Sequence, residues 1–98
     1  MTAYVIARIE VTDPADYATY ASQTVALAEA AGGRFLIKGG AMTQVEGAGP
    51  ERHVIIAFPD RAAAEAFYAS PGYQAILPVA LRSSRRDLVI VDGVEEGS

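Results

Sequence analysis

The sequence predicts a single α+β domain with the element order strand–helix–strand–strand–helix–strand. Four short segments are rich in β-branched and aromatic residues, as strands are. Two longer segments repeat apolar residues at three- and four-residue spacing, and each follows an aspartate that can cap a helix. The chain has 98 residues, which suits one domain and is too short for two. We therefore treat residues 1–98 as one domain, with residues 93–98 as a loose tail.

The first strand covers residues 3–11, and the first helix follows it. Alternation gives this strand two faces, one with Val5, Ala7, Ile9 and Val11 and the other with Tyr4, Ile6, Arg8 and Glu10. Asp13 is expected to cap the helix, and Pro14 suits its first position, where the N–H that proline lacks would be unpaired anyway. Gly32-Gly33 ends the helix, because glycine adopts the left-handed conformation common at helix C-termini.

The next two strands are predicted to form a hairpin. Residues 34–38 begin the second strand, a bulge or bend at Gly39-Gly40 interrupts it, and it resumes to about Val45. A turn-rich loop at residues 46–50 leads to the third strand at residues 52–58. The short connection predicts antiparallel pairing of the two strands.

The second half of the chain supplies a helix and the last strand. Asp60 caps the second helix, whose buried stripe is expected to contain Ala62, Ala63, Ala66 and Phe67. Residues 73–81 are expected to form a further short helical piece interrupted by Pro78, and residues 87–91 form the last strand. The resulting βαββαβ order is the ferredoxin-like arrangement, in which a four-stranded antiparallel sheet carries both helices on one face.

The uncovered face of such a sheet should be polar, and in this sequence it is not. The third strand carries Val54, Ile56 and Phe58 on one side and His53, Ile55 and Ala57 on the other. Leaving several apolar side chains in water would forgo several kcal/mol, at roughly 25 cal/mol per Å2. Since two-fold homodimers are the commonest oligomers, we expect a second copy of the chain to cover this face. The alternative is a monomer with a ligand groove on its sheet.

Composition excludes several classes of function. The net charge of −4 argues against nucleic acid as a partner, which requires clustered Lys and Arg. Arg82, Arg85 and Arg86 form one dense basic run, which we interpret as a solvated loop. The chain has no cysteine, so disulfides and thiol chemistry are excluded and the cytoplasm is favoured. No apolar stretch reaches the roughly 18 residues of a membrane span, so no membrane association is expected.

Short motifs along nearly the whole chain resemble those of one known family. Their order and spacing match in Tyr4–Arg8, Asp13-Pro14, Tyr17–Tyr20, Gly32–Phe35, Lys38–Gly40, Glu46-Gly47, Phe58-Pro59 and Ser70–Gln74. The chain thus resembles the family known as domain of unknown function 1330 (DUF1330). The resemblance implies the dimeric α+β barrel superfamily, in which two ferredoxin-like sheets face each other. Relatives in that superfamily include cofactor-free monooxygenases, haem-degrading enzymes, muconolactone isomerase-like enzymes and dimers without an assigned activity, and the fold alone does not choose among them.

Two positions depart from the pattern of that family. Lys38 stands where the family usually has arginine before the Gly-Gly pair, and Ala57 stands where it usually has glutamate before the Phe-Pro pair. If those two residues form an ion pair or an acid–base pair in relatives, this chain lacks the carboxylate. A proton-transfer role at that position is then absent.

Five residues are candidates for a ligand site: Arg8, Lys38, Glu46, His53 and Tyr73. His53 is the one histidine of the chain and a candidate general base or haem ligand, with a packed or partly exposed strand histidine as the alternative. Arg8 and Lys38 are cations in apolar strands and could bind a ligand carboxylate or pair with a nearby glutamate. Glu46 lies by a glycine-rich turn, and Tyr73 could close a pocket. A metal site is not expected, because one histidine without cysteine makes a poor ligand set.

Three functions remain open from the sequence. The first is a homodimer that binds a small organic molecule in a pocket between sheet and helices, without a cofactor. The second is a cofactor-independent monooxygenase or isomerase acting on a small aromatic or lactone substrate. The third is a structural or regulatory dimer without a ligand.

Tyr17 and Tyr20 lie on the buried stripe of the first helix and are expected to pack in the core with their hydroxyls satisfied.

Overall fold

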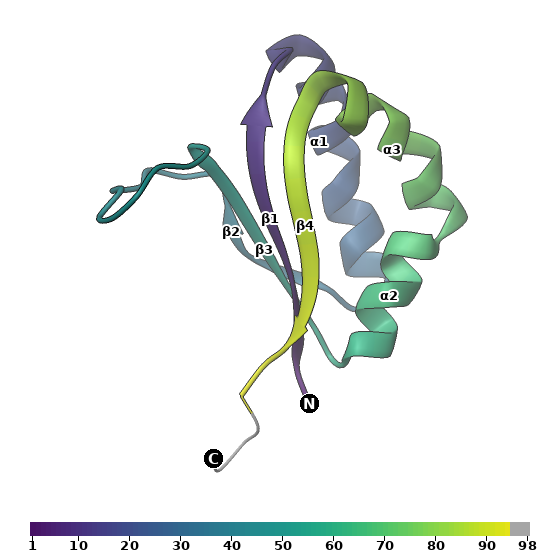
Figure 1. Cartoon of the computed structure of the whole chain (residues 1–98). Helices are drawn as coiled ribbons and strands as arrows, with labels where there is room; N and C mark the ends of the chain where they lie inside the picture. Colours follow the sequence, from purple (N-terminus) through teal and green to yellow (C-terminus); the bar gives the residue numbers. More distant parts are fainter. Residues whose placement is uncertain (95–98) are drawn as a thin grey trace.

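The computed structural model describes residues 1–94 and has the predicted ferredoxin-like architecture. Its strands are β1 (Ala3–Val11), β2 (Arg34–Lys38), β3 (Arg52–Phe58) and β4 (Ser84–Asp92), and its helices are α1 (Pro14–Ala30), α2 (Arg61–Ala69) and α3 (Pro71–Ser83). The strands pair antiparallel in the order β2-β3-β1-β4. All three helices lie on one face of the sheet, which leaves the other face open (Figure 1). Part of the predicted tail, residues 95–98, lies outside the described residues, while the Gly93 N–H donates to the Thr2 carbonyl at 2.7 Å.

Both predicted helix caps are present. The Asp13 carboxylate accepts a hydrogen bond from the Asp16 N–H at 3.2 Å, and the Asp60 carboxylate accepts one from the Ala63 N–H at 2.7 Å. Each carboxylate thereby satisfies a backbone donor that the helix itself leaves unpaired. Gly32 follows α1 with φ +89°, a conformation that favours glycine. The capping signals in the sequence therefore place both helix starts correctly.

Four sequence-based expectations are corrected. β2 ends at Lys38 and does not resume to Val45, because Gly39 and Gly40 have φ values of +72° and +90° and turn the chain out of the sheet. The helix after Ser70 is not interrupted at Pro78, since α3 is anchored on both sides of the proline by its buried residues Tyr73, Ile76, Ala80 and Ser83. β4 begins at Ser84 and not at residue 87, so Arg85 and Arg86 belong to a strand. In α2 the buried residues are Ala64 and Phe67, while Ala62 and Ala66 are exposed.

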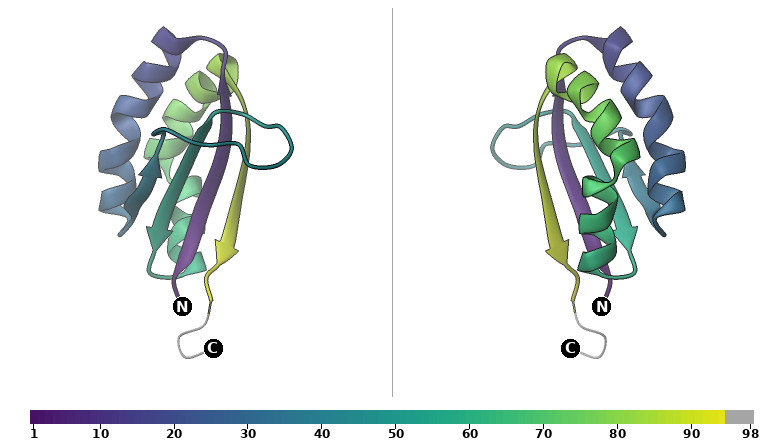
Figure 2. Two further views of the ribbon diagram at one scale, coloured as in Figure 1. Left: turned by 90° about the vertical axis from the view of Figure 1, so that its left-hand side faces the viewer. Right: turned by 90° about the vertical axis from the view of Figure 1, so that its right-hand side faces the viewer.

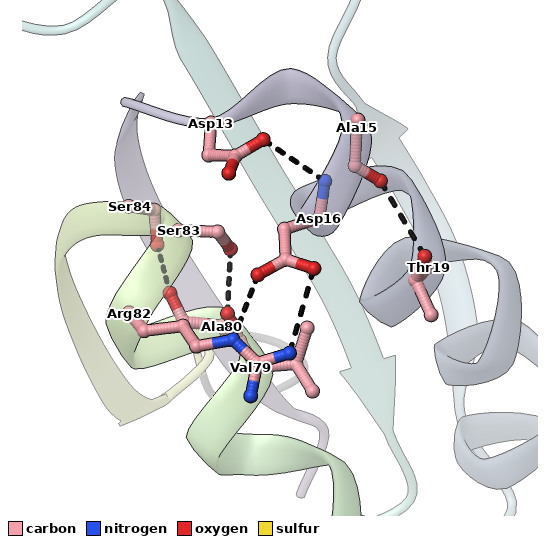
Figure 3. Close-up of polar contacts among 9 residues, drawn as sticks. All are labelled: Asp13, Ala15, Asp16, Thr19, Val79, Ala80, Arg82, Ser83 and Ser84. Atoms are coloured by element: carbon pink, nitrogen blue, oxygen red, sulfur yellow. Dashed lines mark hydrogen bonds and ion pairs between the residues drawn. The ribbon is translucent and has the colours of Figure 1, made fainter.

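Side-chain hydrogen bonds cluster where α3 ends and β4 begins. The hydroxyls of Ser83 and Ser84 donate to the carbonyls of Val79 and Ala80 in the last turn of α3 (Figure 3). The Arg82 guanidinium donates to the Asp16 carboxylate at 2.7 Å and so ties α3 to the first turn of α1.

The core fills the space between helices and sheet. From the strands it includes Val5, Ala7, Ile9, Val54, Ile56 and Phe58, and from the helices Tyr17, Tyr20, Ala28, Ala64, Phe67, Tyr73, Ile76 and Ala80. The loop of residues 39–51 leaves the sheet on the other side and passes in front of the open face (Figure 2). No helix within residues 1–94 is long and apolar enough to cross a membrane.

Candidate functional site

A small cavity of about 30 Å3 lies between the helices and the sheet. That volume has room for roughly two water molecules. Most of its wall is apolar, and its polar side chains come from α1, α3 and three strands. The lining comprises Val5, Ala7, Ile9, Tyr17, Tyr20, Ala21, Thr24, Phe35, Lys38, Arg52, Val54, Ile56, Phe67, Tyr73, Arg86 and Leu88. We call it the helix–sheet cavity.

Two tyrosine hydroxyls and one guanidinium meet in this cavity. The hydroxyls of Tyr20 in α1 and Tyr73 in α3 are 2.7 Å apart and share a hydrogen bond. Arg86 of β4 donates from Nη1 to the Tyr20 oxygen at 2.9 Å and from Nη2 to the Tyr73 oxygen at 2.8 Å. We call these three residues the Tyr-Arg cluster. It joins two helices to the sheet through groups that are 53 and 66 residues apart in sequence.

The protonation states of the cluster follow from its surroundings. Burial raises the pKa of the Tyr20 phenol well above its ordinary value, and the neighbouring Tyr73 raises it further. Burial alone would lower the pKa of Arg86, but the Tyr20 and Tyr73 oxygens outweigh burial and raise that pKa. At neutral pH the phenol of Tyr20 is therefore neutral and the guanidinium of Arg86 is charged. Tyr20 therefore takes part in the cluster as a protonated hydroxyl, and Arg86 takes part as a charged donor.

Arg52 supplies a second guanidinium to the same cavity. Its central carbon lies 5.5 Å from the centroid of the Tyr17 ring, and its Nη1 lies close to Gly39, where a Cβ atom would clash with it. The Arg52 Nε is buried and has no hydrogen-bond partner among the described residues. A buried unpartnered donor of this kind is rare and costly. Lys38 is exposed beside it, with its ammonium 5.6 Å from the centroid of the Phe35 ring.

The structure divides the predicted site residues between two faces of the sheet. Lys38 and Tyr73 line the helix–sheet cavity, as a ligand role would require. Arg8 and His53 are paired across β1 and β3 on the open face, so they do not share that cavity. Glu46 is exposed in the loop of residues 39–51, away from the cavity lining.

Sequence reasoning missed the two arginines of the cavity. Arg86 was interpreted as part of a solvated loop, yet it lies in β4 on the helix-facing side with Leu88 and Ile90, two and four residues later. Arg52 likewise shares the helix-facing side of β3 with Val54 and Ile56. Strict alternation, continued back from the apolar residues of each strand, is the signal that finds both. Tyr17 and Tyr20 were expected to pack in the core, and both are buried there.

The open face is apolar at its centre and charged at its edge. Pairing of the strands places Tyr4, Ile6, Ile37, Ile55, Val89 and Val91 together on it. Val89, Val91 and Ile37 remain 50%, 46% and 41% exposed. Charged groups surround this patch, including Arg85 and Glu10 at 3.9 Å. Ile90 is not part of it, because it faces the helices and packs against the core.

The comparisons with known proteins agree with this architecture. The family model for DUF1330, the domain of unknown function that the motifs resemble, matches residues 2–94, and the chain belongs to that family. No curated protein matches the chain.

Solved structures share the fold at low sequence identity. A protein of unknown function from Rhodopseudomonas palustris is 14% identical with a TM-score of 0.77, over 96% of this chain and 83% of that one. SnoaB, a cofactor-independent oxygenase from Streptomyces nogalater, is 14% identical with a TM-score of 0.66, over 98% and 96% of the two chains. A dimeric ferredoxin-like protein of unknown function from Jannaschia sp. CCS1 is 15% identical with a TM-score of 0.65, over 95% and 100%. At such identities the likeness shows the fold and not the activity.

Proposed function

We propose that this member of the DUF1330 family forms a homodimer through its open face and binds a small organic molecule in the helix–sheet cavity. The observation that carries the binding function is the Tyr-Arg cluster, which brings polar groups of three elements together inside an otherwise apolar cavity. Binding sites for small molecules typically combine an apolar wall with a few convergent polar groups.

The dimer is supported by the exposed apolar residues of the open face. Leaving Ile37, Val89 and Val91 about half exposed is unfavourable, and a second copy would remove them from water. The loop of residues 39–51 carries the further apolar side chains Met42 and Val45, which are 40% and 85% exposed. Because this loop passes in front of the open face, it would lie against the partner subunit (Figure 2).

An enzymatic function has less support than binding. The fold is shared with SnoaB, a cofactor-independent oxygenase, which keeps a reaction of that class as the alternative. Within the described part of the chain, the lining of the cavity contains no His, Asp or Glu that could take a proton from a substrate. Since the phenol of Tyr20 stays protonated, the Tyr-Arg cluster is suited to hold a ligand oxygen and not to abstract a proton.

Cavity filling tests the binding function. Ala21 of α1 lines the cavity, and the substitution Ala21→Leu adds three carbon atoms to a space of about 30 Å3. Ala26→Leu adds the same atoms to an exposed position of the same helix and serves as the matched control. In a ligand-observed NMR screen of small organic fragments, we expect binders for the wild type and Ala26→Leu that Ala21→Leu loses. Fragments that bind Ala21→Leu equally well would place the site elsewhere, and a screen without binders would favour a dimer without a ligand.

A further inference from the structure

The helix–sheet cavity carries positive charge that nothing in its wall balances. Lys38, Arg52 and Arg86 line it, and among residues 1–94 no aspartate or glutamate does. The ion pairs found within residues 1–94 involve other cations, namely Arg61, Arg82 and Arg85. A guanidinium withdrawn from water without an anionic partner is destabilising. Charge therefore favours an anionic ligand.

The hydrogen bonds in the cavity show the same imbalance. Tyr20 and Tyr73 have two hydroxyl hydrogens, and their mutual bond uses one of them, so the other is left to donate. Arg52 adds the buried Nε–H that has no acceptor within the described part of the chain. The Thr24 hydroxyl already donates to the Ala21 carbonyl at 2.9 Å. The cavity thus has unused donors, and an occupant rich in acceptors would satisfy them.

The size and shape of the cavity select among anions. Its volume of about 30 Å3 matches roughly two waters, which is the space that the two oxygens of a carboxylate would replace. A guanidinium can bind two oxygens of either a carboxylate or a phosphate, but a phosphate brings four oxygens and therefore needs more space than a carboxylate group. Because the two oxygens take up most of this volume, the ligand can carry only a very short hydrocarbon part, which would lie against apolar side chains such as Val5, Val54 and Phe67.

We propose that the ligand of this cavity is a short-chain organic carboxylate, bound through its oxygens by Arg52 and the Tyr-Arg cluster. The inference rests on the proposed binding function and names the chemical class of its ligand. Lys38, exposed at the edge of the cavity, adds attraction for an anion that enters. Arg52 provides recognition, since its Nε gains the acceptor that it lacks.

A pair of isosteric probes tests the class of ligand. Propionate and propionamide have nearly the same shape, and only propionate is charged. Titrated into the full-length protein at constant ionic strength and followed by NMR, propionate should bind at least about tenfold more tightly than propionamide, as expected for a charged rather than a neutral hydrogen-bonded contact. Inorganic phosphate, titrated in the same way, should not displace propionate.

Substitution of one arginine tests the site. Arg52→Gln should weaken propionate binding about tenfold or more and leave propionamide nearly unchanged. Arg61→Gln removes the same charge from an exposed arginine of α2 outside the cavity, and propionate affinity should stay within about twofold of the wild type. Arg52→Lys, which keeps the charge and loses the planar donor edge, should lie between Arg52→Gln and the wild type.

The possible failures are distinguishable. Equal affinity for propionate and propionamide would overturn the carboxylate while leaving small-molecule binding intact. If phosphate displaces propionate, or if Arg52→Gln and Arg61→Gln lose equal propionate affinity, the protein attracts anions in general and has no specific carboxylate site. Absence of binding by both probes at millimolar concentration, together with an empty fragment screen, would overturn the proposed function as well.

Discussion

Removing the Tyr20 hydroxyl should destabilise the protein by about 2–3 kcal/mol. The substitution Tyr20→Phe keeps the ring and its edge-on contact with Tyr73, whose centroid is 6.1 Å away. It removes one neutral hydrogen bond to the Tyr73 hydroxyl and one charge-assisted bond from Arg86. A neutral bond contributes about 1 kcal/mol and a charged one about 1.5–3 kcal/mol, and part of the charged bond is recovered by the remaining Tyr73 oxygen.

Urea and thermal unfolding at one fixed protomer concentration would measure this loss. For a domain of this size, 2–3 kcal/mol corresponds to a fall in the midpoint temperature of roughly 8–24 °C. Protomer concentration must be fixed because the stability of a dimer depends on it. Tyr68→Phe is the matched control, since the Tyr68 ring packs on Tyr73 at 5.2 Å while its hydroxyl has no hydrogen bond within residues 1–94. We expect Tyr68→Phe to stay within about 0.5 kcal/mol of the wild type.

A double-mutant cycle separates the shared bond from the rest. Tyr20→Phe and Tyr73→Phe each remove the bond between the two hydroxyls, so their sum counts it twice. The double variant should therefore be less destabilised than the sum of the single variants by about 1 kcal/mol. A Tyr20→Phe protein as stable as Tyr68→Phe, or strictly additive single variants, would refute the structural role of the cluster.

Three further predictions concern the proposed dimer interface, the ion pair between α1 and α3, and the close packing at Gly33. Light scattering should show a dimer of twice 10.3 kDa for the wild type and a monomer for Ile55→Asp. Glu29→Lys, on the solvent side of α1, should remain a dimer. If both variants behave alike, the interface is not on the open face. The hydrogen bond from Arg82 holds the pKa of the Asp16 carboxyl below 3.8, so its stabilisation is present above pH 3.8 and lost as the pH falls through the lowered pKa. NMR titration of Arg82→Gln should return that pKa to about 3.8, and an unchanged pKa would contradict the pair. Gly33→Ala should cost about 1–3 kcal/mol in urea unfolding, because its Cβ would lie 2.7 Å from a phenylalanine ring, and a neutral effect would show that the ring moves aside.

The fold was predictable because its signals are local. Asp13 and Asp60 mark the helix starts, and the paired glycines after α1 mark where that helix ends. These signals depend on the backbone of a few neighbouring residues and need no knowledge of the partner elements. The errors arose where tertiary packing overrides a local rule, as at Pro78, which normally interrupts a helix but is held within α3 by buried neighbours.

The site was less predictable because it depends on which face of each strand meets the helices. His53 and Arg52 are adjacent, and a change of one residue moves a side chain to the opposite face of a sheet. His53 is a candidate because histidine titrates near neutral pH, but the residue that lines the cavity is its neighbour Arg52. The facing of β3 is set by packing of Val54 and Ile56 against α1 and α3, which becomes evident only when the layers are assembled.

The two faces of the sheet differ in how their charged side chains are balanced. On the open face, Asp87 stands opposite Arg8 in the pairing of β1 with β4, and Arg85 lies 3.9 Å from Glu10, so each of these two arginines has an acidic residue nearby. On the helix-facing side, the hydrogen-bond partners of Arg86 within residues 1–94 are the hydroxyls of Tyr20 and Tyr73. Arg85 and Arg86 are consecutive in sequence, yet alternation assigns one to a balanced surface and the other to a cavity with unbalanced positive charge. Dimer formation would suit the open face, because covering that face mainly buries apolar groups. The positive charge of the cavity is not balanced by the residues described in its wall, and this imbalance is the basis on which we propose an anionic ligand there.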